Sequence, residues 1–197
     1  MAERIAASNV NKYVQDKYGE IQNKISNEIL GLCALLQNDF EGQNDCTLTS
    51  ITEITRFYSV HYYPEKVVYD TVKTVAIKYG YTDGYGTFSI TVNKIVNKIN
   101  QMYNIPKKSK SGYLKGIGYS IKTIIDNINN KTPMILNMSN DGRSYYKNHS
   151  VTVVGYNDYT VKGKHIYMLR IHDNWTNQDS FIDYQKLCLI SSLNYCK

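Results

Sequence analysis

The spacing of hydrophobic residues changes once along this chain, near Pro133, and this change constrains the fold more than any other feature of the sequence. Before Pro133 the apolar residues recur every three or four positions, which is the spacing of amphipathic helices. After Pro133 they alternate with polar residues or form short β-branched runs, as strands do. Helices followed by strands are typical of an α+β domain with a mainly antiparallel sheet. We therefore predict that fold class.

The helical part of the sequence predicts a series of amphipathic segments. Apolar residues between Val10 and Ile29 predict one long helix over residues 8–29. Another helix is expected directly after Asp45, with Asn44 or Asp45 as its N-cap, because their short side chains accept hydrogen bonds from first-turn amides. Further helices are expected around residues 68–79, 90–103 and 117–128, with glycine-rich loops at 81–86 and 111–118.

Strands are expected over residues 134–138, 149–156, 165–172 and 181–184. We expect the second and third to form a hairpin around residues 157–164 that pairs Tyr156 with His165, which would place His149 opposite His172. Residues 30–197 are expected to form one domain. Residues 1–29 are expected to be an N-terminal helical segment that packs on this domain, is the remnant of a pro-segment, or binds a partner.

Composition argues against two classes of protein. The net charge of +6 comes from 23 Lys and Arg against 17 Asp and Glu. The densest basic run, residues 107–110, is short and has no interleaved aromatic residues, so it is expected to be a solvated loop and not a nucleic-acid site. No apolar run approaches the roughly 18 residues that a membrane-spanning helix needs. No signal peptide opens the sequence, although removal during maturation would leave the same absence.

Cys46 is the most informative of the cysteines, which are Cys33, Cys46, Cys188 and Cys196. No CxxC pair occurs, so a zinc ribbon or a thioredoxin-type site is not expected. A disulfide between Cys188 and Cys196 is left open. Cys46 falls in the first turn of a predicted helix, where the helix dipole favours a thiolate. Because Asp45 opposes this effect if it points at the sulfur, Cys46 needs a base to act as a nucleophile.

His149 is the best-placed base, since it begins a predicted strand next to a polar loop. The predicted hairpin brings Asp173 and Asn174 near it, and either side chain would orient the imidazole. Taken singly, Cys46 is more simply a small buried residue and His149 a structural one. Their order along the chain, Cys, His, then Asp or Asn, favours a catalytic site. The remaining histidines, His165 and His172 in particular, are expected to be structural and not metal ligands.

Three stretches carry a resemblance to a known family. The sequence QNDCTLTS, residues 43–50, resembles the nucleophile segment of bacterial papain-like cysteine peptidases, and most closely that of the double-glycine (bacteriocin leader) peptidases and their secreted relatives. HSVTVVGY, from His149, is similar to the histidine strand of that group. IHDNW, residues 171–175, is similar to its third segment. In two positions the chain departs from the pattern: Thr47 replaces a common glycine, and Asn174 replaces a proline.

The resemblance covers roughly residues 30–187 and implies a papain-like fold that hydrolyses peptide bonds. It implies Cys46 as nucleophile, His149 as base and Asp173 as the third member, with Asn174 as the alternative. The intermediate would be a thioester acyl-enzyme, and no metal or cofactor is required.

The oxyanion hole of such an enzyme uses the nucleophile's N–H and an upstream glutamine. Gln37 is favoured for this role and Gln43 is kept. The resemblance also implies a peptide or protein substrate, no nucleic acid, and a secreted or cell-surface location, otherwise a cytoplasmic one. The alternatives are an inactive peptide-binding module and a Cys-His-Asp amidase or acyltransferase on the same fold. Oligomeric state and cleavage specificity do not follow from the sequence.

Overall fold

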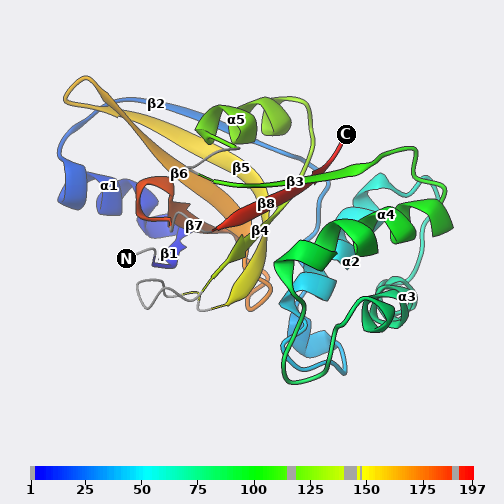
Figure 1. The fold of residues 1–197 in the computed structure, drawn as a ribbon. Helices are drawn as coiled ribbons and strands as arrows, with labels where there is room; N and C mark the ends of the chain where they lie inside the picture. The colour runs from blue at the N-terminus through cyan, green and yellow to red at the C-terminus, as the bar shows by residue number, and fades with distance from the viewer. Residues whose placement is uncertain (1–2, 115–118, 140–145, 147, 188–190) are drawn as a thin grey trace.

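The computed structural model describes residues 3–114, 119–139, 146, 148–187 and 191–197. Helices and an antiparallel sheet together make up this part of the chain (Figure 1), which confirms the predicted α+β class. None of the helices described is long and apolar enough to cross a membrane. The helices are α1 (Val10–Tyr18), α2 (Cys46–Tyr58), α3 (Glu65–Lys78), α4 (Val92–Met102) and α5 (Ile121–Asn129). The strands are β1 (Ile5–Ala6), β2 (Ile21–Glu28), β3 (Ser109–Tyr113), β4 (Met134–Met138), β5 (His149–Val161), β6 (Lys164–His172), β7 (Ser180–Asp183) and β8 (Ser192–Cys196).

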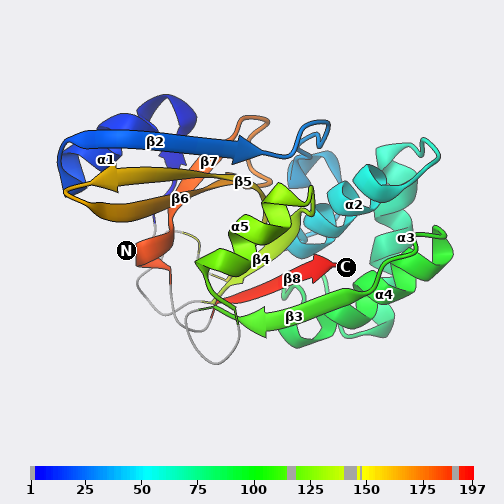
Figure 2. The ribbon, with the colours of Figure 1, turned by 90° about the horizontal axis from the view of Figure 1, so that it is seen from above.

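The longest strand, β5, organises the sheet. The strand order is β1-β7-β6-β5-β4-β8-β3, and β2 also pairs with β5. β6 runs along one edge of β5, and the other edge is divided between two strands. β4 pairs with residues 149–153 and β2 pairs with residues 155–161, as Figure 2 shows from above. The first strands of the chain therefore belong to the same sheet as the last ones.

Gly155 lies where β4 gives way to β2. A Cβ atom at this position would lie 2.6 Å from the carbonyl oxygen of Asn27, which is closer than side chains approach. The register of β5 against β6 also shifts between Val153 and Gly155, as at a β-bulge. Glycine is required here because the backbone of β2 passes directly over it.

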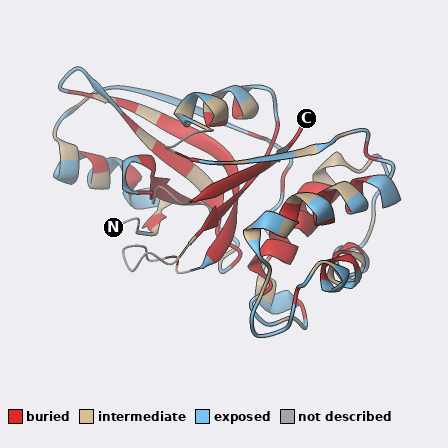
Figure 3. Ribbon diagram, in the orientation of Figure 1, coloured by how far each residue is buried: buried red, intermediate tan, exposed pale blue. Residues whose placement is uncertain are grey.

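The two faces of the sheet bury different helices. On β4, Met134 and Leu136 belong to the apolar cluster that includes Ile124 of α5. Ile135, between them, belongs to the cluster formed by α2, α3 and α4. Successive residues of a strand point to opposite faces, so the sheet separates α5 from the α2–α4 layer. Residues 46–55 of α2 are all buried in this layer, as Figure 3 shows.

Residues 8–29 do not form one helix, and that prediction is wrong. α1 ends at Tyr18, before Gly19 with a φ of 115°, and residues 21–28 form strand β2. Ile21 and Ile25 are four residues apart, a spacing that keeps side chains on one side of a strand as well as of a helix. α1 packs Val10 and Val14 into a third apolar cluster with residues of β5, β6 and β7.

The predicted hairpin has a different register. β5 and β6 are joined by the two-residue turn Lys162-Gly163, whose φ angles of 49° and 71° suit a tight hairpin turn. Tyr156 therefore pairs with Leu169 and not with His165, and His172 lies opposite Thr152. The pairing predicted from the sequence is wrong because it assumed a long connection.

The sheet also has strands at its far edge that the sequence pattern did not predict. β3 covers residues that we expected in loops, and it pairs with β8 near the C-terminus. β3 is short and mostly exposed, so it lacks the alternating apolar residues that identify a strand. Residues 115–118, which include the start of the helix expected at 117, lie outside the described residues, as does Cys188.

Candidate active site

Helix α2 begins at Cys46, as expected, and Asp45 is its N-cap residue. The carbonyl oxygen of Asp45 accepts a hydrogen bond from the N–H of Thr49 at 2.9 Å. Its carboxylate does not cap the first-turn amides, contrary to our expectation. It accepts a hydrogen bond from the hydroxyl of Tyr69 on α3 at 2.6 Å instead. The helix start is therefore fixed by α3 and by the loop described next.

Asn174 joins the start of α2 to β5. Its amide group lies 3.0 Å from the carbonyl oxygen of Cys46, 2.9 Å from the hydroxyl of Ser50 and 3.1 Å from the carbonyl oxygen of Ser150, and it donates to each. Asn174 has a φ of 62°, a left-handed conformation that asparagine adopts more readily than most residues. Its side chain thus holds the backbone of the nucleophile candidate, and its contacts do not include His149.

The thiol of Cys46 is buried between α2 and β5. Cys46 is 8% exposed, and its sulfur accepts a hydrogen bond from the N–H of Ser150 at 3.3 Å. Burial raises the pKa of the Cys46 thiol, and hydrogen bonds from Ser150 and Thr47 partly oppose this. The thiol is therefore neutral near pH 7 in this arrangement.

His149 begins β5, and its ring is held from two sides. Nε2 lies 2.7 Å from the main-chain oxygen of Asp173. Because a carbonyl oxygen only accepts, Nε2 carries the hydrogen and Nδ1 of the neutral ring is an acceptor. The ring of Trp175 stacks on the imidazole with centroids 4.2 Å apart. Burial lowers the pKa of His149 to about 4, although the contact with Asp173 partly opposes the shift.

Cys46 and His149 line one cleft of about 580 Å³. One wall is the loop of residues 84–89, between α3 and α4, and the other is formed by the end of β4 and the start of β5. The cleft is large enough for several side chains of an extended peptide. The interactions described for the two residues do not include a hydrogen bond between the sulfur and the imidazole. The structure therefore brings the candidate nucleophile and base to the same cleft without joining them directly.

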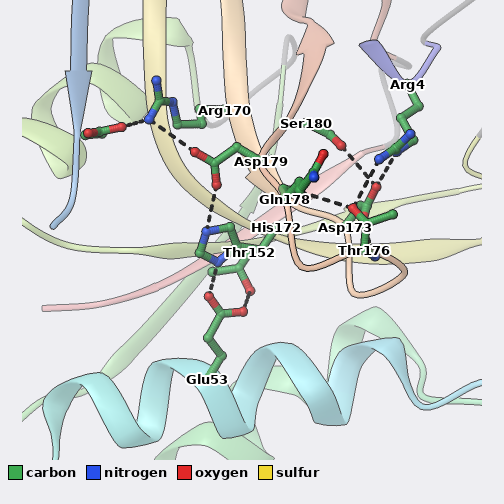
Figure 4. Close-up of polar contacts among 11 residues, drawn as sticks. Arg4, Glu53, Thr152, Arg170, His172, Asp173, Thr176, Gln178, Asp179 and Ser180 are labelled. Atoms are coloured by element: carbon green, nitrogen blue, oxygen red, sulfur yellow. Dashed lines mark hydrogen bonds and ion pairs between the residues drawn. The ribbon is translucent and has the colours of Figure 1, made fainter. Parts of the chain in front are cut away.

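The carboxylate of Asp173 points away from this contact. It is fully buried, and Figure 4 shows it at the side chain of Arg4, whose Nε lies 2.6 Å from Oδ2. The N–H groups of Trp175 and Thr176 donate to Oδ1 at 3.0 Å each. Burial opposes ionisation, but Arg4 and these amides outweigh it and lower the pKa of Asp173. Asp173 meets His149 through its main-chain oxygen.

Neither predicted oxyanion glutamine lines the cleft. Gln37 begins a short 3₁₀ turn, and its N–H donates to the carbonyl oxygen of Asn174 at 2.9 Å. Its side-chain oxygen is buried without a hydrogen-bond partner in the described part of the chain. Gln43 is exposed, and its backbone is bound to Asp83 and Gly84 on the facing loop. Gln37 is thus the glutamine next to the loop that carries Asn174.

The other histidines lie outside the cleft. His172 is buried on β6, where Nδ1 contacts Glu53 of α2 and Nε2 lies 3.2 Å from Asp179 (Figure 4). Burial opposes its charge, but hydrogen bonds to Asp179 and Glu53 outweigh burial and raise the pKa of His172 to about 9. His165 is exposed and pairs with Asp158. His61 is exposed as well.

Sequence reasoning did not assign several residues of the site, among them Tyr146, whose ring also stacks on His149. Ser150 follows the histidine and supplies the N–H to the sulfur, a backbone role that leaves no sequence signal. Trp175 belongs to the third segment of the resemblance, but its stacking on His149 depends on the conformation of the loop. Arg4 lies 169 positions before Asp173, and no local pattern links the two.

Residues 29–188 match the sequence profile of the Peptidase_C39 like family. The chain belongs to this family. The match agrees with the papain-like cysteine peptidases that the sequence resembles, and it supports cysteine peptidase activity in general. No curated protein matches the chain significantly. The matched region contains Cys46, His149 and Asp173, and it begins directly after β2, so that β1, α1 and β2 all lie outside it.

Proposed function

We propose that this family member is a cysteine peptidase in which Cys46 is the nucleophile and His149 the general base. The observation that carries the proposal is that both residues line one cleft while Nε2 of His149 is occupied by a carbonyl oxygen. That contact leaves Nδ1 as the basic nitrogen. Family membership supports the reaction class.

The proposed reaction starts from a neutral thiol and a neutral imidazole. Nδ1 of His149 accepts the thiol proton as the sulfur attacks the peptide carbonyl carbon, giving a tetrahedral oxyanion. The C–N bond then breaks, the proton passes from His149 to the leaving amine, and a thioester to Cys46 remains. His149 next takes a proton from water, whose oxygen attacks the thioester. Collapse of this second intermediate releases the acid product and returns the proton to the sulfur.

The oxyanion would be held by the N–H of Cys46 and by a glutamine amide. The first amides of a helix have no partner within the helix, so the N–H of Cys46 is suited to this task. We favour Gln37 as the glutamine, because its N–H donates to the carbonyl oxygen of Asn174 and this contact places it beside the 173–175 loop. Gln43, exposed on the opposite loop, is the alternative.

The third catalytic position is proposed to be the main-chain oxygen of Asp173. This oxygen fixes the tautomer of His149, which is the task that a side-chain carboxylate performs in other triads. The side chain of Asp173 shapes the loop, and the side chain of Asn174 holds α2. In this proposal, Asp173 orients His149 through its main-chain oxygen, whereas Asn174 holds the start of α2 through its side chain.

The substrate is proposed to be a peptide or protein. Two aromatic side chains on the cleft wall, Tyr85 and Phe88, are 92% and 71% exposed and offer apolar surface to an extended chain. The resemblance to double-glycine peptidases and their secreted relatives supports the same substrate class and a location outside the cell.

The test is hydrolysis of a peptide library by the wild-type chain and by Cys46→Ala, with Cys33→Ala as control because Cys33 is exposed and outside the cleft. We expect Cys46→Ala to abolish cleavage and Cys33→Ala to keep it. Iodoacetamide followed by peptide mapping should label Cys46 in the wild type faster than in His149→Ala. Transfer of the acyl group to added amines, with little hydrolysis, would support an acyltransferase instead. Unchanged cleavage by Cys46→Ala would refute the peptidase proposal.

A further inference from the structure

The N-terminal segment reaches the loop that holds His149. β1 pairs with β7, so that Ile5 lies opposite Phe181 and Ala6 opposite Ser180. This pairing places Arg4, the residue before β1, beside Asp173, as Figure 4 shows. Arg4 lies outside residues 29–188, which match the family. The cation at this site therefore comes from a part of the chain that the family pattern does not include.

The carboxylate of Asp173 folds the loop that follows β6. Oδ1 accepts from the N–H groups of Trp175 and Thr176. Oδ2 accepts from Arg4, from the hydroxyl of Ser180 at 3.2 Å and from the hydroxyl of Tyr146 at 3.5 Å. Arg4 also donates to the hydroxyl of Thr176 at 3.1 Å. Arg4 thus binds both ends of the turn.

The same residue orients His149. The main-chain oxygen of Asp173 accepts from Nε2, and the ring of Trp175, two residues on, stacks on the imidazole. A shift of this loop would move the hydrogen-bond acceptor and the stacking ring together. Asp173 is fully buried, so its charge depends on partners within the protein.

We propose that Arg4 is a positioning residue for His149. Arg4 neutralises the buried carboxylate of Asp173 and thereby fixes the loop that orients the imidazole. The proposal rests on the proposed function, since it assigns His149 as the base. In this proposal, the N-terminal segment supplies a residue that positions the active site, which otherwise lies within the family domain.

The test compares Arg4→Gln, Arg4→Lys, Asp173→Asn and the double variant Arg4→Gln/Asp173→Asn. Arg4→Gln should lower kcat roughly 10- to 100-fold, as small misplacements of catalytic groups do, with little change in KM because Arg4 does not line the cleft. Arg4→Lys should recover part of the loss because it restores the charge. The double variant should be more active than Arg4→Gln, because asparagine can accept the same loop amides without burying an unpaired charge.

The matched control is Arg170→Gln. Arg170 also joins the N-terminal segment to the C-terminal half, but its ion pairs are with Glu28 and Asp179 and not with Asp173. Its loss should lower the unfolding temperature with kcat unchanged. Equal losses of kcat in Arg4→Gln and Arg170→Gln, or strictly additive effects in the double variant, would overturn the proposal.

The rate of Cys46 alkylation by iodoacetamide separates this proposal from the proposed function. If no peptide is cleaved by the wild type, the peptidase proposal fails, but the alkylation rate still reports whether His149 is positioned. We expect Arg4→Gln to approach the rate of His149→Ala. An alkylation rate for Arg4→Gln equal to that of the wild type would contradict the role of Arg4.

Discussion

Burial holds both reacting side chains of the site in their neutral forms. Burial raises the pKa of the Cys46 thiol and lowers that of the His149 imidazole, so a preformed thiolate–imidazolium pair is disfavoured in this arrangement. The proton must then move as the substrate is attacked. Desolvation thus shifts the pKa of the Cys46 thiol in the direction opposite to the one that the sequence predicts from the helix dipole.

This gives a prediction for the pH dependence of the proposed reaction. His149 acts as a base only when it is neutral, so kcat/KM should be retained down to mildly acidic pH and fall as pH drops through about 4. A pH–rate profile on a peptide substrate measures the midpoint. His165→Gln, which changes an exposed histidine, should leave the profile unaltered. An acid midpoint near the ordinary histidine pKa would show that His149 is solvated in the working enzyme.

Asn174 gives a second prediction at this scale. Asn174→Ala should lower the free energy of unfolding by roughly 2–4 kcal/mol, because it leaves buried acceptors without their donor and places alanine at a φ of 62°. Asn174→Gly keeps the backbone conformation and should lose less stability. Urea unfolding of both variants measures the two effects. Equal losses would mean that the backbone conformation contributes nothing.

Single residues show what can be chosen from a sequence and what cannot. Cys46 and His149 could be chosen because each begins an element, and element starts are visible in the sequence. The side-chain direction of Asp173 could not be foreseen, because it depends on Arg4, which the fold brings from the far end of the chain. The sequence therefore predicted the candidate pair but not which atom of Asp173 faces the imidazole.

At the scale of elements, a helix or strand was predicted correctly where the spacing of apolar residues fits either the helical period or the strand period, but not both. α3, α4, β4 and β6 were expected close to their observed positions. The sequence pattern predicts a helix at β2 because isoleucines four residues apart fit both structures, and the other residues of β2 are polar and exposed. The β5–β6 turn carried a usable signal, Gly163 between two alternating runs, which indicates a two-residue hairpin.

The loop of residues 84–89 yields a prediction about substrate binding. Tyr85→Ala and Phe88→Ala should each raise KM for apolar peptides several-fold with kcat nearly unchanged, because each side chain offers binding surface away from the reacting atoms. Steady-state kinetics on peptides with apolar or charged residues would measure this. Ile90→Ala is the matched control, since Ile90 is also exposed but does not line the cleft. The same KM in all variants would place the substrate elsewhere.

At the scale of the molecule, a charge network whose central pair, Glu53 and His172, is buried joins the helical layer to the sheet. Glu53 of α2 contacts His172 of β6, which contacts Asp179, and Asp179 also pairs with Arg170 (Figure 4). Arg170 pairs in turn with Glu28 of β2. Breaking the buried Glu53–His172 pair would leave a charge without its partner in a medium of low polarity. The protonation of His172 is thus tied to the stability of the whole fold.

This network predicts how stability changes with pH. Because the pKa of His172 is raised to about 9 in the folded protein, the folded state holds more protons than the unfolded state between pH 6.5 and 9. Its contribution, about 3 kcal/mol, should be complete below pH 6.5 and be lost as pH rises through 9. Urea unfolding of the wild type and of His172→Gln between pH 6 and 9.5 measures the difference. Parallel pH profiles for the two proteins would contradict the assignment.

The pairing of the first strands with the last ones has a consequence for synthesis. β1 pairs with β7, and β2 pairs with the second half of β5. Both N-terminal strands therefore leave the ribosome long before their partner strands have been synthesised. An unpaired strand edge is a site for aggregation. β2 is rich in polar residues, with the sequence IQNKISNE, and this composition suits a segment that stays solvated and unpaired until its partner strand is synthesised. The polar composition that makes β2 hard to recognise as a strand in the sequence thus also limits aggregation of the nascent chain until β5 is made.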